Sequence, residues 1–411
     1  MEHQIQENSL VAHHLIKVPV SEDEFAEMGR RIQILTRWLM QIDVKGNPTA
    51  TKAFFEYEAL VEKTITSLFP FIQKGNELPN KNPASLANLR KSFVPGSRGI
   101  VIPTGTKTFR YTCHLILNLR SVLKSTLPIQ IVYAGNLDLP PQYRSALLSL
   151  FETHNIGAIE FLDLTKILDD MTLQLSDGLS KWAVKPFALL ASTFEQVILV
   201  DSDAIFLQPP EIILDAHAAY AETGTLFFHD RLIGKSLYRY RHEFWRWQMK
   251  DHTPSSTFRK SRVMNENFGQ EQDSGVVVLD KRRLGVLMGL LHAYEKGELL
   301  WFNGGLVRKK SDDEGKRTFM DVEGDMRWAS DGNWRWNKWG NAWDAACMEG
   351  GVIGNLSEGV KEIITGSVEV AKGADDRFAE LMGLLEPDVL HKEGKHETSV
   401  GGVERADDWS V

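Results

Sequence analysis

The 411-residue sequence has few cysteines and no long hydrophobic run. Its two cysteines, Cys113 and Cys347, exclude a disulfide-rich framework and leave open either one bridge or two free thiols. No apolar stretch approaches the roughly 20 residues of a transmembrane helix. The first residues also lack the basic start and apolar core of a secretory signal peptide. From the sequence as written we therefore expect neither a membrane anchor nor a leader.

Clustered basic residues are absent as well. The formal net charge is −8, and Lys and Arg are mixed with Asp and Glu along the chain. A nucleic-acid-binding surface needs basic residues gathered on one face, so nucleic acid is excluded as a partner. Hydrophobic residues make up 43% and charged residues 25%, which is ordinary for a globular protein with a substantial core.

The sequence divides into three regions. Residues 1–95 are predicted to form a helical stem or accessory region, with amphipathic helices through Phe25 and Phe54. Residues 96–375 alternate short apolar strands with helices in units of roughly 30 residues, which indicates βαβ crossovers and a mostly parallel sheet. Residues 376–411 are predicted to be a flexible tail. The expected fold class is α/β, a Rossmann-like sheet with flanking helices, preceded by a helical region.

Residues 197–200, Val-Ile-Leu-Val, carry the strongest functional signal, because they run directly into Asp201-Ser202-Asp203. A short apolar run of this kind predicts a buried parallel strand, and ligands bind at the carboxyl edge of such sheets. Two carboxylates at that edge favour Mg²⁺ or Mn²⁺ shared with a substrate's phosphates. The alternative is a solvated acidic loop that caps the next helix.

A weaker signal follows the strand predicted at residues 99–103. Thr104-Gly105-Thr106-Lys107 forms a polar turn before a helix, and backbone N–H groups there suit the anionic groups of a nucleotide. The turn matches neither the Walker nor the Gly-x-Gly-x-x-Gly pattern. An ordinary strand-to-helix turn is therefore the alternative interpretation.

Two enzyme classes place Asp-x-Asp after an apolar strand. Phosphohydrolases of the haloacid dehalogenase type use the first Asp as a nucleophile, on an early strand, with Thr or Val two residues beyond the second Asp. Here Ile205 stands at that position, and three predicted strands come first. Glycosyltransferases of the GT-A type place the motif where the nucleotide-binding half of the sheet closes. The order of elements favours the second class.

Eight segments in a fixed order give the sequence a specific resemblance. It resembles the fungal α-1,3-mannosyltransferase family, Golgi enzymes of the GT-A type. The segments are Arg98-Gly-Ile-Val-Ile, Phe109-Arg-Tyr, Leu119-Arg-Ser-Val-Leu, Leu127-Pro-Ile-Gln-Ile-Val-Tyr-Ala-Gly, Lys181-Trp-Ala-Val-Lys-Pro-Phe-Ala, Val197 to Pro209, Gln272-Asp-Ser-Gly-Val and Leu300-Trp-Phe-Asn-Gly.

The resemblance implies a GT-A-like domain over residues 96–375 that uses GDP-mannose as donor and Mn²⁺, or another divalent cation, as cofactor. It implies transfer to a mannan or oligosaccharide of a glycoprotein, with retention of the α configuration. It further implies a place in the Golgi lumen or membrane and possible membership of a mannosyltransferase complex. A lumenal location would make Asn355-Leu356-Ser357 a glycosylation acceptor.

The same resemblance implies roles for individual residues. Asp201 and Asp203 would hold the metal, with Asp273 facing the mannose or the acceptor and His292 as a third ligand. The residues expected near the nucleotide or donor are Thr104, Gly105, Arg110, Lys185 and Ser202. Three of these residues also have an interpretation without a functional role. Lys185 would be a surface lysine on a helix, Asp273 would lie in a plain hairpin, and His292 would be a histidine that binds no metal.

One departure from the family is internal. Members carry an acidic motif, Gly-Asp-Lys-Glu with Phe-Trp shortly after, between the Ser-Gly-Val strand and the Trp-Phe-Asn-Gly segment. Here only Lys281 to Glu298 fills that interval, and the motif is missing. The alternative function is therefore a catalytically impaired member, which binds a nucleotide sugar or glycan or serves as a scaffold subunit.

Overall fold

The computed structural model describes residues 2–20, 24–44, 51–73, 85–152, 157, 159–177, 184–229, 243, 246–248, 272–292, 335–338, 346–349 and 357–383. Its helices are α1 (Glu2–Lys17), α2 (Phe25–Val44), α3 (Lys52–Leu68), α4 (Ser85–Lys91), α5 (Phe109–Leu117), α6 (Gly135–Asp138), α7 (Pro141–Glu152), α8 (Leu164–Ile167), α9 (Asp170–Leu173), α10 (Val184–Ala191), α11 (Glu211–Ala216), α12 (Ala218–Thr223), α16 (Leu284–His292) and α17 (Glu358–Gly383). Short 3-10 turns cover Pro70–Ile72 and Leu175–Asp177, and a π-helical turn, η2, covers Asn118–Val122.

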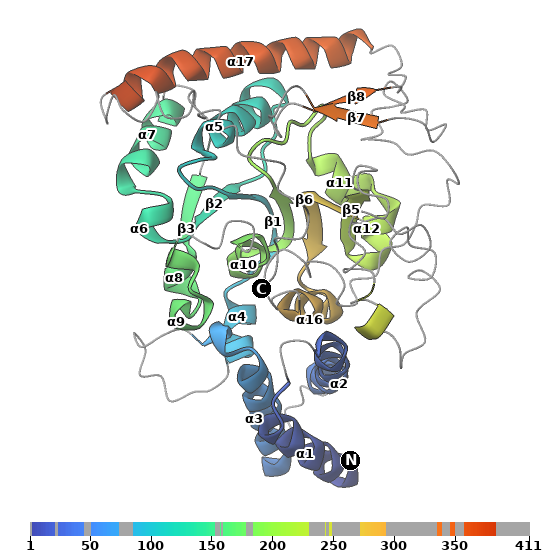
Figure 1. Cartoon of the computed structure of the whole chain (residues 1–411). Helices are drawn as coiled ribbons and strands as arrows, with labels where there is room; N and C mark the ends of the chain where they lie inside the picture. The colour runs from blue at the N-terminus through green and yellow to red at the C-terminus, as the bar shows by residue number, and fades with distance from the viewer. Residues whose placement is uncertain are drawn as a thin grey trace.

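A six-stranded sheet forms the centre of the molecule (Figure 1), in the order β3-β2-β1-β4-β6-β5. Strands β3, β2, β1 and β4 run parallel to one another, and β6 is antiparallel to both β4 and β5. A separate pair, β7 and β8, forms a small antiparallel sheet. The strands are β1 (Val94–Pro103), β2 (Ile129–Tyr133), β3 (Ile159–Asp163), β4 (Phe194–Val200), β5 (Thr225–His229), β6 (Gln272–Asp280), β7 (Arg335–Lys338) and β8 (Ala346–Glu349).

Strand β4 is buried on both faces, which explains its continuous apolar sequence. Val197 and Leu199 join a core that also contains α10 and α16, whereas Ile198 and Val200 join a second core with α5. Helices therefore cover both sides of the sheet, as the βαβ pattern requires. The predicted fold class, a mostly parallel α/β sheet with flanking helices, is confirmed.

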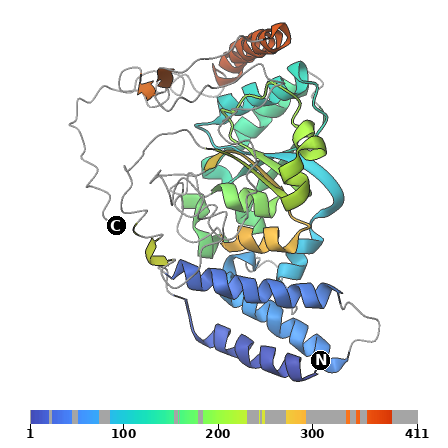
Figure 2. The same ribbon diagram turned by 90° about the vertical axis from the view of Figure 1, so that its right-hand side faces the viewer.

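The predicted helical region before the sheet is also confirmed. Helices α1, α2 and α3 lie together at one end of the molecule, below the sheet in the orientation of Figure 2. Helix α2 packs against α16, and the backbone N–H of Ala26 donates to Oε1 of Gln248 at 2.8 Å. In the part of the chain that the structure describes, no helix is long and apolar enough to span a bilayer.

The predicted tail boundary at 375/376 needs correction, because it falls inside α17, which continues to Gly383. The helix lies across α5 and α7 (Figure 1), and the side-chain amide of Asn118 donates to the hydroxyl of Ser367 at 2.8 Å. Glycines at 359, 366 and 373 weaken its helical signal in the sequence. Tertiary packing on α5 compensates for this weak propensity.

The structure describes the side chain of one of the two cysteines. Cys113 is a free thiol on the buried face of α5, 1% exposed, and burial raises its pKa far above the usual value. The side chain of Cys347 lies outside the described residues, as do Asn355 and Leu356 of the acceptor motif, Trp301-Phe302-Asn303-Gly304 and the tail from residue 384.

Candidate active site at the carboxyl edge of the sheet

Polar residues follow each of the four parallel strands at the same edge of the sheet. The registers pair Pro103 with Val132 and Tyr133 with Asp163, so β1, β2 and β3 end side by side. Strand β4 lies next to β1 and ends at Val200, directly before the Asp-x-Asp motif. The predicted edge therefore exists, and it brings the Thr104–Gly105 turn and Asp201 to adjacent strand ends.

The Asp-x-Asp turn is fixed by main-chain hydrogen bonds. The N–H of Asp201 donates to the carbonyl of Gly275 at 2.7 Å, which ties the turn to β6. The N–H of Ala204 donates to the carbonyl of Asp201 at 3.0 Å and closes the turn. Ser202 is 6% exposed, whereas the side chain of Asp203 is exposed. One carboxylate thus faces inward and the other faces solvent.

Lys185 lies against the first of these carboxylates. Its Nζ is 2.6 Å from Oδ2 of Asp201 and 3.0 Å from the hydroxyl of Ser274. The residue is 4% exposed, so the interpretation of Lys185 as a surface lysine of the helix is wrong. Helix α10 runs back from the carboxyl edge before β4 begins, which is why its first turn meets the end of that strand.

The structure adds Ser274, whose role the sequence did not reveal. Its hydroxyl and its carbonyl both accept from Nζ of Lys185, at 3.0 and 3.4 Å. The only available signal was its place in the Gln272-Asp273-Ser274-Gly275 segment. Residues 274 and 275 together fix both members of the Lys185–Asp201 pair.

At the neighbouring strand ends, Thr104 and Gly105 form a close-packed turn. The N–H of Thr104 donates to the carbonyl of Val132 at 2.8 Å, and the N–H of Gly105 donates to the hydroxyl of Thr108 at 3.1 Å. A Cβ on Gly105 would overlap Oδ1 of Asp138. The close approach of this carboxylate therefore favours glycine at position 105.

Asp138 is a further acidic group that the sequence reasoning missed, although it follows the strand at 129–133. Its Oδ2 accepts from the N–H of Ala134 at 2.9 Å. Burial raises the pKa of this carboxyl, the Ala134 N–H opposes the shift, and the negative charge of Asp163 adds to it. Asp163 itself accepts from the N–H groups of Gly135 and Thr165, both at 3.1 Å, and is explained as a helix cap.

Arg110 points to a different part of the molecule. Its Nε and Nη2 lie 2.8 and 2.6 Å from the two carboxylate oxygens of Asp375, on α17. His114 adds a contact of 2.6 Å to the same carboxylate. Hydrogen bonding to Arg110 lowers the pKa of Asp375. In this structure Arg110 holds α17 onto α5, and its predicted contact with a nucleotide stays a prediction.

Two predicted site residues are placed only by their backbones. Asp273 lies in β6, in register with Phe228 of β5, and His292 is the last residue of α16. Both side chains lie outside the described residues.

The side chains at this edge can be compared with the ligands that a divalent cation prefers. Asp201 and Asp203 offer the carboxylate oxygens that Mg²⁺ and Mn²⁺ prefer. Within the described ranges, no group of three or more His, Cys, Asp or Glu side chains could hold a metal. The residues therefore fit an ion that takes most of its other ligands from phosphate oxygens and water.

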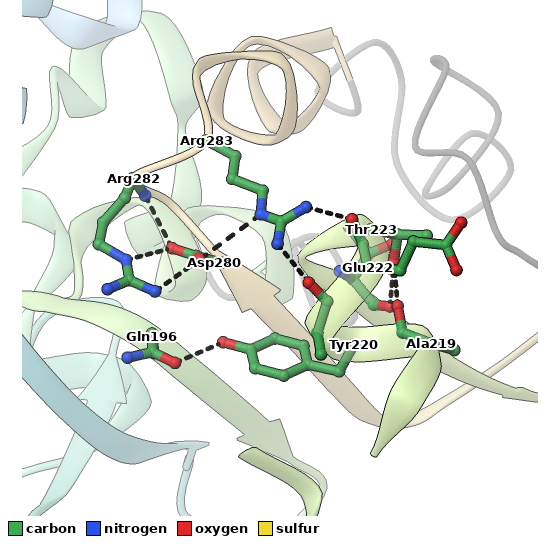
Figure 3. Close-up of polar contacts among 10 residues, drawn as sticks. Gln196, Ala219, Tyr220, Glu222, Thr223, Asp280, Arg282 and Arg283 are labelled. Carbon is green, nitrogen blue, oxygen red and sulfur yellow. Dashed lines mark hydrogen bonds and ion pairs between the residues drawn. The ribbon is translucent and has the colours of Figure 1, made fainter. Parts of the chain in front are cut away.

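A second polar network occupies the opposite edge of the sheet, where β6 ends (Figure 3). The two oxygens of Asp280 accept from Arg282 at 2.8 Å each, and Arg283 donates to the carbonyls of Ala221 and Glu222 at the end of α12. The hydroxyl of Tyr220 donates to Gln196 at 3.0 Å. These contacts join the end of α12 to the residues after β6 and to β4, so the network is explained by stability.

Comparisons with known proteins agree with the geometry. A family model described as "Mannosyltransferase putative" matches residues 97–305. "Putative alpha-1,3-mannosyltransferase MNN14" of Candida albicans is 32% identical over 171 residues, which cover 40% of this chain and 23% of that protein. "Alpha-1,3-mannosyltransferase MNT2" of Saccharomyces cerevisiae is 32% identical over 148 residues, covering 35% of this chain and 25% of that protein. The matched part is about a quarter of the length of these curated relatives.

Two glycosyltransferases are among the solved structures that match this chain. The bifunctional enzyme WbbM has a TM-score of 0.33 at 13% identity, covering 52% of this chain and 37% of that one. The galactosyltransferase LgtC, solved with donor and acceptor sugar analogues, has a TM-score of 0.30 at 12% identity, covering 45% and 59%.

Proposed function

This chain belongs to the fungal α-1,3-mannosyltransferase family, and on that premise we propose that it transfers mannose from GDP-mannose to a mannose-containing glycan of a glycoprotein. The proposed reaction retains the α configuration, forms a 1,3 linkage and depends on Mn²⁺ or another divalent cation. We place the reaction in the Golgi lumen, where a mannosyltransferase complex would be the natural partner.

The observation that carries this proposal is the Asp201–Lys185 pair beside an exposed Asp203, at the edge where the parallel strands end. Cleavage of a sugar–diphosphate bond leaves negative charge on the phosphates, and fixed cations lower its energy. Asp201 and Asp203 would hold the metal against the diphosphate, and Lys185 would supply a second positive charge. The Thr104–Gly105 turn would face the nucleoside side of the donor.

The direct experiment measures mannose transfer from GDP-mannose to an α-mannoside, together with thermal stabilisation of the protein by GDP and Mn²⁺. We expect both to be present in the wild type and absent from Asp201→Asn/Asp203→Asn. The matched control is Asp43→Asn, which removes an exposed carboxylate from α2 and should change neither. Wild-type protein that shows no stabilisation by GDP with Mn²⁺ would refute the proposal.

A second candidate function rests on the short interval after β6. Residues 281–298, of which Leu284–His292 form α16, stand in place of the longer acidic segment expected from the family resemblance. A catalytically impaired member that still binds a nucleotide sugar would show GDP-linked stabilisation without mannose transfer. The same two assays therefore separate the candidates.

A further inference from the structure

The contact between Lys185 and Asp201 has a consequence for metal binding. An ammonium group 2.6 Å from Oδ2 already neutralises the inward carboxylate of the Asp-x-Asp motif. The side chains of Lys185 and Asp201 are 5% and 18% exposed, so solvent screens this pair less than a surface ion pair. A divalent cation on Asp201 would stand close to that ammonium and be repelled by it.

We propose that Lys185 competes with the divalent cation for Asp201, and that the donor's diphosphate relieves the competition by taking over the ammonium. The inference rests on the proposed function, because the diphosphate is that of the nucleotide sugar. Without nucleotide, Lys185 keeps Asp201 paired and metal affinity low. With nucleotide, phosphate oxygens give the ammonium another anionic partner, and Asp201 becomes available to the metal.

Ser274 stabilises the nucleotide-free arrangement. Its hydroxyl and carbonyl accept from Nζ at 3.0 and 3.4 Å, from the side of β6. Because these acceptors are neutral, they orient the ammonium without matching the attraction of a diphosphate. Loss of the hydroxyl should therefore loosen Lys185 without changing the charge of the site.

The test is Mn²⁺ affinity, measured by electron paramagnetic resonance of the free ion, on full-length protein with and without GDP. We expect Lys185→Gln to bind Mn²⁺ about tenfold more tightly than wild type when GDP is absent, because one unit of repelling charge is removed. With GDP present the order should reverse, because the variant lacks the ammonium that neutralises the diphosphate. Lys185→Arg, which keeps the charge, is the matched control and should stay within about threefold of wild type without GDP.

Ser274→Ala provides a second route if Lys185→Gln does not fold. It should raise Mn²⁺ affinity in the absence of GDP by a smaller factor, about two- to fivefold. Metal affinities of Lys185→Gln and Ser274→Ala equal to or weaker than wild type without GDP would overturn the competition. Wild-type protein that binds no Mn²⁺ even with GDP would reject the proposed function, and this inference with it. Binding with GDP but no reversal in Lys185→Gln would reject the inference alone.

Discussion

Substitution of Gly105 by alanine should destabilise the fold through one identifiable contact. The backbone of Gly105 is not in the left-handed region, so the substitution introduces no backbone strain. A Cβ there would instead overlap Oδ1 of Asp138 and lie 3.3 Å from its Cγ. Asp138 cannot move freely, because its other oxygen accepts from the N–H of Ala134.

The magnitude follows from what the carboxylate would lose. Ala134 is 1% exposed, so rotating Asp138 away leaves a buried N–H without its acceptor, at about 1–3 kcal/mol. Retaining Asp138 in place instead costs about 1–3 kcal/mol of overpacking. The cheaper of the two responses sets the result, and we expect a loss of about 2 kcal/mol in the free energy of unfolding.

The assay is urea unfolding of a double-mutant cycle with Asp138→Ala. Because the second substitution removes the overlapping atoms, Gly105→Ala should cost little when Asp138→Ala is already present. The control is Gly285→Ala in α16, where an added Cβ meets nothing within 4 Å and the helix should gain up to about 1 kcal/mol. Additive effects of the Gly105 and Asp138 substitutions would refute the reasoning.

Two further predictions concern charge. Burial raises the pKa of Asp138, so ionising this carboxyl costs more in the folded state than in the unfolded state, and wild-type stability falls as pH rises from 3.8 through the raised pKa. Asp138→Asn should therefore gain stability relative to wild type across that pH range. Urea unfolding that shows the same difference between the two proteins at every pH would contradict this. Arg110→Gln should lose about 0.5–1 kcal/mol and expose α17 amides to hydrogen exchange, because the exposed pair with Asp375 anchors that helix. Since Arg110 lowers the pKa of Asp375, the stability lost in Arg110→Gln should become smaller as pH falls from 3.8 through the lowered pKa. A large fall in the GDP affinity of Arg110→Gln would instead support Arg110 as a nucleotide contact.

The centre of the sheet was predictable because β2 and the end of β4 are buried on both faces and consist mostly of apolar residues. The Asp-x-Asp turn could be placed for the same reason, since it follows such a run. Strand β1 begins at Val94, earlier than the strand predicted at residues 99–103, and so includes Pro95. That first part pairs irregularly with β4, with a register shift between Val94 and Arg98, which is where a proline can be tolerated.

Contacts between distant elements were not predictable in the same way. Lys185 and Asp201 are separated by a helix and a strand, and only the rotation of α10 about its axis decides whether the lysine faces the sheet or the solvent. Asp375 lies 265 residues from Arg110, on a helix with weak propensity, and pairs with it only after α17 has packed on α5. Packing, which no local pattern encodes, determines both pairs.

Two buried lysines lie at the two ends of α10, one with a structural role and the other with a proposed functional role. Lys281 is 2% exposed and donates to the carbonyls of Leu189 and Ser192 at 2.9 and 2.5 Å, at the helix end where the dipole is negative. Burial lowers its pKa well below the usual value, and both of these hydrogen bonds satisfy carbonyls at the end of the helix. Lys185 is in the first turn of the same helix, where the dipole is positive and disfavours a cation. The position of Lys185 therefore depends on its contact with Asp201. A residue that is unfavourable for its own helix but is held by a carboxylate at a ligand-binding edge is expected to have a functional role.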